Sequence, residues 1–496
     1  MQKLRLLTIV TLLLAACCTA CNPGVDSEDT LENTSPETSS RSLRQDDRTK
    51  NVDEIFSDWD TAETPGAVLE VIRDGRIIYQ RAYGMADLER DVPLSLKSVF
   101  DIASTSKQFV AMSILLLQEQ DKMSLDDDVR KHLPEIPDYG QTITVRHLIQ
   151  HTSGIRDYMD LMVLAGMKHE NSYHPSVIID LIVRQKALNF EPGEEFHYSN
   201  SGYLLLAEII ERVSGKTLGE FTGQHIFRPL AMNASHFYDD FTRTVKNRAL
   251  SYSRKETGGY ASIQYIFDVV GDTGLLTTLE DLFLWDQNFY LNKLGEGGSK
   301  LIEQVQTHGR LNSGKILHYA FGLEIETYRG LSIVKHSGSA AGYRSEMLRF
   351  PGQKFTVIVL SNLAGFSPTT LAEQVADLYL ADEYTAGPED ARTEPEDAGA
   401  ARSRVEPDMG AGEHHAYGGH YYSAELDATY VVRRMDGKLR YHLVHFRVET
   451  PMVRTGRDTW DADDAQFLFL RENGEAVTGL SLSAGRIRDL YFERIR

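Results

Sequence analysis

Strand-like runs at the two ends of one long segment constrain the fold of this chain most strongly. Residues 66–84 read GAVLEVIRDGRIIYQRAYG, in which two apolar, β-rich runs flank Asp74-Gly75 and so predict a hairpin. Strand-like runs return after residue 320, at 321–327, 331–338, 346–350 and 355–362. Because these strands bracket a segment with a different pattern, they predict one mostly antiparallel sheet beside a separate lobe.

The segment between the strands has helical spacing. Apolar residues recur at helical intervals in 107–120, 175–187, 201–215 and 277–291. In the last of these stretches, Thr277 and Glu280 fit a capping box at the start of the helix. We therefore expect an α/β (α+β) domain over residues 47–384, with a mostly antiparallel sheet flanked by helices, a helical lobe, and a cleft between sheet and lobe.

The composition changes after this domain. Residues 385–413 are rich in proline, glycine, alanine and acidic residues, which is typical of a linker. Residues 414–496 alternate apolar and polar side chains between turn signals such as Asp436-Gly437 and Asn473-Gly474. This pattern predicts a small all-β domain, either an antiparallel sheet or a barrel.

The N-terminus has the features of an export signal. Lys3 and Arg5 precede an apolar run that is too short to span a bilayer comfortably, so residues 1–21 are expected to be a signal peptide. Within it, LAAC ending at Cys17 resembles the lipobox of bacterial lipoproteins, and plain secretion with cleavage nearby is the alternative. Residues 22–46 have almost no large apolar residue and are expected to be a disordered tether. We therefore expect an exported protein of the bacterial cell envelope, joined to the membrane only through lipid on Cys17.

Charge and cysteine content exclude two kinds of function. The net charge of −20 over 496 residues opposes phosphate backbones, so nucleic-acid binding is not expected. All three cysteines, Cys17, Cys18 and Cys21, lie in the signal region, so the folded part has neither a disulfide nor a thiol nucleophile. The sequence leaves the oligomeric state open.

Two Ser-x-x-Lys pairs occur in the chain, and their predicted secondary structure separates them. Ser332 and Lys335 lie in a predicted strand, where residues three apart point to opposite faces. Ser104 and Lys107 open a predicted helix, where residues three apart share a face with Cβ atoms roughly 5 to 6 Å apart. A serine hydroxyl is a weak nucleophile, and a neighbouring lysine amine activates it once the lysine pKa is depressed. The alternative is that Ser104 or Thr105 caps the helix and Lys107 is solvated.

Two later motifs give the first pair its context. FHYSNSGYLLL places Tyr198 and Asn200 at the start of another apolar helix, and KHSGSAAGYRSE places His336-Ser337-Gly338 on a strand that enters a glycine-rich bend. In this order, Ser-x-x-Lys, Tyr-x-Asn and His-x-Gly resemble the three motifs of the serine β-lactamase and penicillin-binding protein superfamily. The flanking stretches FDIASTSKQFVA, LIQHTSGI, EPGEEFHYSNSGY and GDTGLLTTLEDL are similar to its class C β-lactamase-related branch, over about residues 50 to 384. The β-rich C-terminal segment is similar to the appendages of some of these hydrolases.

The resemblance implies a role for each matching position, and the implied site comprises Ser104, Lys107, Tyr198, Asn200, His336, Gly338 and Ser339. Ser104 would be the acylated nucleophile, Lys107 its base, and Tyr198 the proton shuttle at the leaving group. Asn200 would donate a hydrogen bond to the substrate amide. The backbone N–H groups of Ser104 and Ser339 would form the oxyanion hole. No metal or other cofactor is implied.

His336 bears on the choice of substrate. Many β-lactamases carry lysine there, a permanent cation for the substrate carboxylate, whereas a histidine with a reference pKa of about 6.5 is mostly neutral at neutral pH. Some D-alanyl carboxypeptidases, D-aminopeptidases and esterases of the superfamily also carry His-x-Gly. The resemblance thus implies a serine hydrolase that forms an acyl-enzyme with small esters or D-amino-acid peptides. A nearby cation such as Arg344 could replace the lysine, so a true β-lactamase is one alternative, and a catalytically silent penicillin-binding-like sensor is another.

The other histidines do not suggest a metal site. His151 lies in the loop QHTSG and is expected to hold its turn rather than to react. His414, His415 and His420 follow the linker and have no cysteine or carboxylate pattern around them, so we expect them to be solvated.

Overall fold

The structure is a computed structural model that describes residues 47–168, 171–263, 268–387, 414–446, 448–473 and 476–495. The predictions for Cys17, for the tether at 22–46 and for most of the linker at 385–413 lie outside these residues. The features described below belong to one compact unit, Arg48–Arg496.

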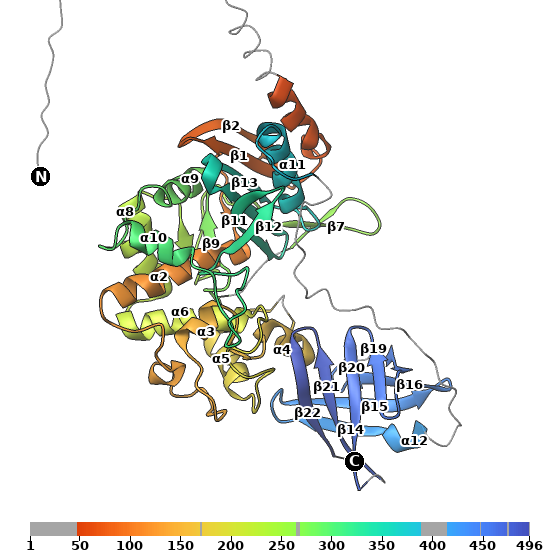
Figure 1. The fold of residues 1–496 in the computed structure, drawn as a ribbon. Coiled ribbons are helices and arrows are strands. Elements are labelled where there is room, and N and C mark those ends of the chain that lie inside the picture. The colour runs from red at the N-terminus through yellow and green to blue at the C-terminus, as the bar shows by residue number, and fades with distance from the viewer. Residues whose placement is uncertain are drawn as a thin grey trace, which may run out of the picture. The chain divides into compact units, whose positions relative to one another are not determined.

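A six-stranded antiparallel sheet forms the centre of the first domain (Figure 1). Its strands are β1 (Ala67–Arg73), β2 (Arg76–Tyr83), β10 (Glu324–Tyr328), β11 (Leu331–Ala340), β12 (Tyr343–Phe350) and β13 (Phe355–Ser361). The order β10-β11-β12-β13-β1-β2 pairs the hairpin from the start of the domain with strands from its end. Asp74 and Gly75 both have positive φ, 51° and 72°, as a two-residue hairpin turn requires. The prediction of one mostly antiparallel sheet is confirmed.

Both faces of this sheet are buried, each by a different apolar cluster. Val68 and Ile72 of β1 belong to the cluster that contains helix α9 (Leu279–Asn288). Leu69 and Val71 belong to the cluster on the other face, which contains helix α11 (Pro368–Leu380). Because successive side chains of a strand alternate between faces, burial on both sides explains the nearly unbroken apolar run of β1.

The helical lobe is built around α2 (Lys107–Glu119). Every residue from Lys107 to Leu117 is buried, as the all-round apolar sequence predicts. This helix packs against α6 (Asn200–Ser214). The other helices are α3 (Val145–Ile149), α4 (Tyr158–Leu164), α5 (Pro175–Val183), α7 (Leu218–Thr222), α8 (Arg228–Leu230) and α10 (Ser299–Val305).

Short strands complete the first domain. One of them, β9, includes Thr277, so helix α9 starts later than the sequence predicted. They are β3 (Met85–Asp87), β4 (Val92–Pro93), β5 (Phe100–Asp101), β6 (His236–Phe237), β7 (Tyr252–Arg254), β8 (Tyr260–Ser262) and β9 (Leu275–Thr277). Thr278, not Thr277, is the N-cap of α9, and its side chain accepts from the backbone N–H of Asp281. The predicted capping box of Thr277 and Glu280 is wrong, because pairing with Phe100 of β5 keeps Thr277 in strand β9.

The second domain is a nine-stranded antiparallel sheet. Its strands are β14 (Gly419–Ser423), β15 (Ala428–Met435), β16 (Lys438–Leu443), β17 (Thr450–Pro451), β18 (Val453–Arg454), β19 (Thr459–Ala462), β20 (Ala465–Glu472), β21 (Ala476–Ala484) and β22 (Ile487–Arg494), preceded by a short helix, α12 (His414–Tyr417). The order β17-β16-β15-β14-β22-β21-β20-β19-β18 puts β17 and β18 at its two ends. Only Met452 separates these strands along the chain, so the sheet curls into a near-barrel. The predicted small β domain is confirmed.

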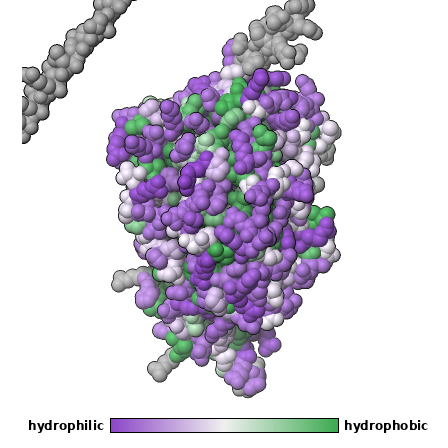
Figure 2. Space-filling model, turned by 90° about the vertical axis from the view of Figure 1, so that its left-hand side faces the viewer, coloured by the Kyte–Doolittle hydropathy of each residue, from purple (hydrophilic) through white to green (hydrophobic). Residues whose placement is uncertain are grey.

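The face of the molecule shown in Figure 2 is mainly polar. Hydrophilic residues cover most of the face shown in Figure 2, with apolar residues in patches between them. Among the described residues, no helix is long and apolar enough to cross a membrane.

Candidate active site

The start of α2 brings Ser104 and Lys107 together. A short 3-10 turn, Ala103–Ser106, leads from β5 into α2, and Lys107 is the first residue of the helix. The Lys107 Nζ lies 3.1 Å from the Ser104 Oγ. The two side chains are therefore in hydrogen-bond contact, on the shared helical face from which their pairing was predicted.

The second Ser-x-x-Lys pair is separated by its strand. On β11, Ser332 is exposed, whereas Lys335 is buried. The Lys335 Nζ lies 3.4 Å from a carboxylate oxygen of Glu324 and 3.0 Å from one of Glu326, both on the neighbouring β10. The alternation of the strand thus directs this amine to a pair of glutamates and away from Ser332.

Three oxygen atoms surround the Lys107 amine. Its Nζ lies 3.1 Å from the Ser104 Oγ, 2.9 Å from the Asn200 Oδ1 and 2.8 Å from the backbone oxygen of Asp272. The amide and backbone oxygens can only accept, so they hold the two N–H bonds of a neutral lysine. The remaining lone pair of that amine then faces the Ser104 hydroxyl, which is the geometry that a general base requires.

Burial lowers the proton affinity of the Lys107 amine. Lys107 is 0% exposed, and burial lowers its pKa from 10.5 to about 8. The carboxylates of Asp272 and Asp157 oppose this change, while the guanidinium of Arg486 adds to it. A lysine with a pKa near 8 has a substantial neutral fraction just above neutral pH, so Lys107 can accept a proton there.

Tyr198 keeps its proton. Its ring centroid lies 4.9 Å from the Lys107 Nζ. Burial raises the pKa of Tyr198 well above 10.0, although a hydrogen bond with Ser104 opposes the rise. Lys107 is therefore the better base for Ser104, and the neutral phenol of Tyr198 is suited to relaying a proton.

His336, which contacts Tyr319, is buried and is a neutral imidazole. The residue is 2% exposed on β11. Its Nδ1 is 2.7 Å from the backbone oxygen of Ser337, and its Nε2 is 3.1 Å from the hydroxyl of Tyr319. Burial, reinforced by the charge of Lys107, lowers the pKa of His336 to about 3. A single Nδ1 proton satisfies both contacts, because the carbonyl accepts it and the Tyr319 hydroxyl donates to Nε2.

Gly338 lets the sheet approach the nucleophile turn closely. A Cβ atom on Gly338 would lie 2.2 Å from the backbone oxygen of Ile102 and 2.3 Å from the Ser345 Oγ. The Thr105 hydroxyl, one residue after Ser104, lies 3.1 Å from the backbone oxygen of His336 and so ties the same turn to β11. The glycine of the His-x-Gly motif is therefore required by the space between β11 and the turn that carries Ser104.

The predicted oxyanion residue is next to this glycine. Ser339 is exposed on β11, and it pairs with Arg344 on β12. The Arg344 guanidinium donates to the backbone oxygens of Ala341 and Tyr343, at 3.0 and 2.7 Å. The role of the Ser339 N–H group in binding an oxyanion stays a prediction.

Two side chains outside the motifs hold the Tyr198–Asn200 segment. The His151 Nδ1 accepts from the backbone N–H of Ser199 at 3.1 Å, and its ring centroid lies 4.3 Å from that of Tyr198. The Asp157 Oδ2 accepts from the backbone N–H of Asn200 at 2.5 Å. His151 thus has the positioning role predicted for it, whereas sequence reasoning missed Asp157.

Asp272 is a second acid that sequence reasoning missed. Its backbone oxygen contacts Lys107, and its Oδ2 accepts from the Tyr158 hydroxyl at 3.0 Å. Burial raises the pKa of Asp272 to about 6, against the effect of Lys107. Asp272 lies in GDTGLL, one of the stretches that carried the resemblance, so a signal was present. Asp157 and Tyr319 had no comparable signal.

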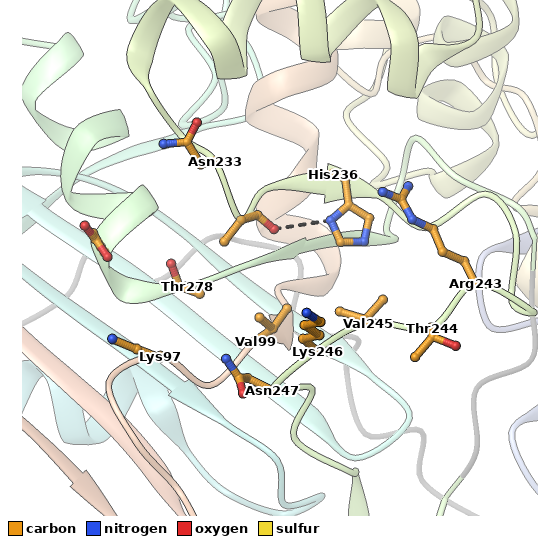
Figure 3. Close-up of a pocket in the computed structure, with 12 residues that line it drawn as sticks. Lys97, Val99, Asn233, His236, Arg243, Thr244, Val245, Lys246, Asn247 and Thr278 are labelled. Atoms are coloured by element: carbon orange, nitrogen blue, oxygen red, sulfur yellow. Dashed lines mark hydrogen bonds between the residues drawn. The ribbon is translucent and has the colours of Figure 1, made fainter. Parts of the chain in front are cut away.

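A pocket is lined by residues other than those of the Ser104 site described above (Figure 3). Its lining includes Lys97, His236, Arg243 and Lys246, and the His236 Nδ1 is 3.2 Å from the backbone oxygen of Ala234. None of the residues that line it belongs to the Ser104 cluster.

Comparison with known proteins shows which family the first domain resembles. The family model described as Beta-lactamase matches residues 52–381. Penicillin-binding protein 4* of Bacillus subtilis (strain 168) is 34% identical over 313 residues, which cover 58% of this chain and 66% of that protein. A D-aminopeptidase of Brucella anthropi is 29% identical over 301 residues, which cover 61% of this chain and 56% of that protein. The chain thus spans less than two thirds of the length of these curated relatives.

Solved structures agree on the fold. The octameric penicillin-binding protein homologue from Pyrococcus abyssi superposes with a TM-score of 0.60 at 24% identity, over 90% of this chain and 99% of that one. A penicillin-binding protein from Bacillus halodurans superposes with a TM-score of 0.56 at 25% identity, over 67% of this chain and 98% of that one. The Pyrococcus abyssi structure covers more of this chain than the Bacillus halodurans structure does, and the additional residues include part of the β-rich second domain.

The close approach at Gly338 can be tested by adding one methyl group. Gly338→Ala should displace the turn that carries Ser104, because the new Cβ would overlap backbone and side-chain oxygens. A displacement of about 1 Å is enough to slow a reaction roughly 10²-fold. We expect at least this loss in the rate at which a fluorophosphonate labels Ser104. Gly352→Ala is the matched control, since a Cβ at Gly352 meets nothing within 4 Å. Labelling of Gly338→Ala at the wild-type rate would contradict the argument.

Proposed function

Since this chain belongs to the beta-lactamase family, we propose that it is a serine hydrolase that forms an acyl-enzyme on Ser104. The observation that carries the proposal is the contact of 3.1 Å between the Lys107 Nζ and the Ser104 Oγ, inside a buried site that lowers the lysine pKa to about 8. A solvated lysine beside a helix cap would show neither the burial nor the two further acceptors. The contact therefore favours an enzyme over a silent sensor.

The residues divide the reaction between them. Lys107 removes the proton of the Ser104 hydroxyl as the oxygen attacks the carbonyl carbon of the substrate. The backbone N–H groups of Ser104 and Ser339 stabilise the oxyanion. Tyr198 passes a proton to the leaving group, which departs and leaves an ester on Ser104. Water then attacks this ester, and the reverse proton transfers release the acid and the free serine.

Asn200 holds the base and also has an N–H bond for the substrate. Its Oδ1 accepts from Lys107, which leaves its Nδ2 with the Met159 sulfur at 3.4 Å as a weak partner. The second N–H bond of this amide is suited to donating to the substrate amide oxygen. One side chain thus orients both the base and the bond that is broken.

For the substrate, we propose small esters or D-amino-acid peptides. The neutral, buried His336 offers no permanent cation for the carboxylate of a cephalosporin. Arg344, the candidate replacement, donates to two backbone oxygens of its own turn. The similarity to a D-aminopeptidase of Brucella anthropi supports a peptide substrate of D configuration.

Two variants and a pH profile test the acyl-enzyme. Ser104→Ala should abolish labelling by a fluorophosphonate, and Lys107→Ala should slow it by about 10²- to 10⁴-fold, as expected for a lost general base. The pH dependence of labelling tests the base. Because the active form of Lys107 is neutral and its pKa is about 8, the rate of fluorophosphonate labelling of the wild-type protein should rise with pH and level off above about pH 8. His336→Asn should keep this rise, since His336 is neutral throughout that range. Labelling that survives Ser104→Ala would refute the assignment of the nucleophile.

A comparison of substrates tests specificity. We expect kcat/KM for p-nitrophenyl butyrate or a D-alanyl-D-alanine peptide to exceed kcat/KM for the cephalosporin nitrocefin. Arg344→Gln should leave this order unchanged. If nitrocefin is hydrolysed far faster than both other substrates, the chain is a true β-lactamase and His336 does not set its specificity.

For the location, we propose export to the bacterial cell envelope with lipid on Cys17, on the basis of the LAAC motif and the polar stretch after it. Such a tether would let the enzyme range over nearby substrate while it stays bound to the membrane. Cys17→Ala should move the protein from the membrane fraction to the soluble fraction. An unchanged distribution would rule out the lipid anchor.

A further inference from the structure

A hairpin of the second domain contacts the loop that precedes α4. Strands β21 and β22 are joined by a turn that contains Gly485 and Arg486. The Arg486 Nη2 lies 3.0 Å from the Oδ1 of Asp157, which is 1% exposed. The backbone N–H of Arg486 donates to the Asp160 Oδ2 at 2.7 Å, and its Nε lies 3.2 Å from the same oxygen. One arginine of the β domain therefore binds two acids of the first domain.

The hairpin is fixed in this position by further bonds. The Asn189 Nδ2 donates to the backbone oxygen of Arg486 at 2.8 Å, and the backbone N–H of Arg488 donates to the Asn189 Oδ1 at 2.8 Å. The Arg156 guanidinium donates to the backbone oxygen of Arg488 at 2.9 Å and pairs with Glu425 at 2.8 Å. Arg156 and Glu425 are both buried, with side chains 1% and 6% exposed. The position of Arg486 is thus set by the docking of the whole β domain.

Asp157 connects this hairpin to the reaction centre. One carboxylate oxygen binds Arg486, and the other accepts from the backbone N–H of Asn200. Asn200 in turn accepts from Lys107, which contacts Ser104. A continuous series of polar contacts therefore joins an arginine of the second domain to the nucleophile of the first.

We propose that Arg486 is a positioning residue of the active site, which holds Asp157 and offsets its charge so that Lys107 can act as a neutral base. This inference rests on the proposed function only in the identity of the base. The second domain is then a structural part of the active site, whatever else it does.

The charges around Lys107 give the expected direction of the effect. The titratable and charged groups that face Lys107 or Arg486 are Asp157 and Asp160 at the start of α4, Tyr198 before α6, Tyr203 on α6, Asp272 before β9, Arg486, and the neutral His151 and His336. Asp157 raises the pKa of Lys107 and Arg486 lowers it. Removing the arginine leaves the carboxylate uncompensated, which favours the ammonium form of Lys107 and reduces the neutral base at a given pH.

The test is the pH dependence of two readouts in the full chain. The first is the rate of fluorophosphonate labelling. The second is the NMR titration of the Lys107 Cε resonance in ¹³C-lysine-labelled protein, assigned by its absence from Lys107→Ala. For Arg486→Gln, we expect both midpoints to rise by about one pH unit or more. In Arg486→Lys, both midpoints should stay close to their wild-type values, because the lysine keeps the positive charge.

Two controls separate this effect from loss of domain docking. Arg488 lies on the same hairpin and pairs with Glu195 at 2.9 Å, where both side chains are over 40% exposed, at 43% and 47%. Arg488→Gln should leave both midpoints at their wild-type values. In Asp157→Asn/Arg486→Gln, where both charges are absent, the midpoints should return close to the wild-type values.

The outcomes that would overturn the proposal are distinct. An unchanged Lys107 midpoint in folded Arg486→Gln, or an equal shift in Arg488→Gln, would show that Arg486 only attaches the domains. If Arg486→Gln does not fold, Asp157→Asn is the second test. This variant removes the carboxylate that raises the pKa of Lys107, so the Lys107 midpoint should fall. A midpoint that does not fall in Asp157→Asn would overturn the proposal. If wild-type protein is not labelled at Ser104, the hydrolase assignment fails, while the NMR titration still decides the role of Arg486.

Discussion

The burial of one amine organises this active site. Lys107 has no exposed surface, and an amine without water needs protein acceptors in fixed positions. The three oxygen atoms around the amine come from different parts of the first domain: the turn before α2, the start of α6 and the segment before β9. The site therefore exists only when these elements are packed together, and the same packing that lowers the lysine pKa also aims the amine at Ser104.

The central sheet supplies the second requirement, which is close contact between β11 and the nucleophile turn. Helices cover both of its faces through separate apolar clusters, so the sheet cannot move away from the lobe without exposing one of them. Gly338 then allows two segments to meet at a distance that any side chain would prevent. Rigidity and close approach together explain how a hydroxyl and an amine are kept within hydrogen-bond distance.

Local signals in the sequence predicted much of this arrangement. The spacing of Ser104 and Lys107 at a helix start places them on one face, and Asp74-Gly75 predicts the β1–β2 hairpin, so both features could be predicted from residues close together in the sequence. The capping box was wrong because the extent of β9 depends on strands distant in the sequence. Asp157, Tyr319 and Arg486 were missed for the same reason: nothing near them in the sequence shows which charges or rings they will meet after folding.

The contacts between the domains also order events in time. Arg156 precedes Arg488 by 332 residues, so at roughly 5 to 20 residues per second a ribosome needs about 15 to 70 s to pass from one to the other. Until residue 486 has been made, Asp157 has no guanidinium partner from the second domain, and until residue 425 has been made, Arg156 lacks Glu425. The electrostatic environment of the nucleophile is thus completed only after the last hairpin has been synthesised and docked.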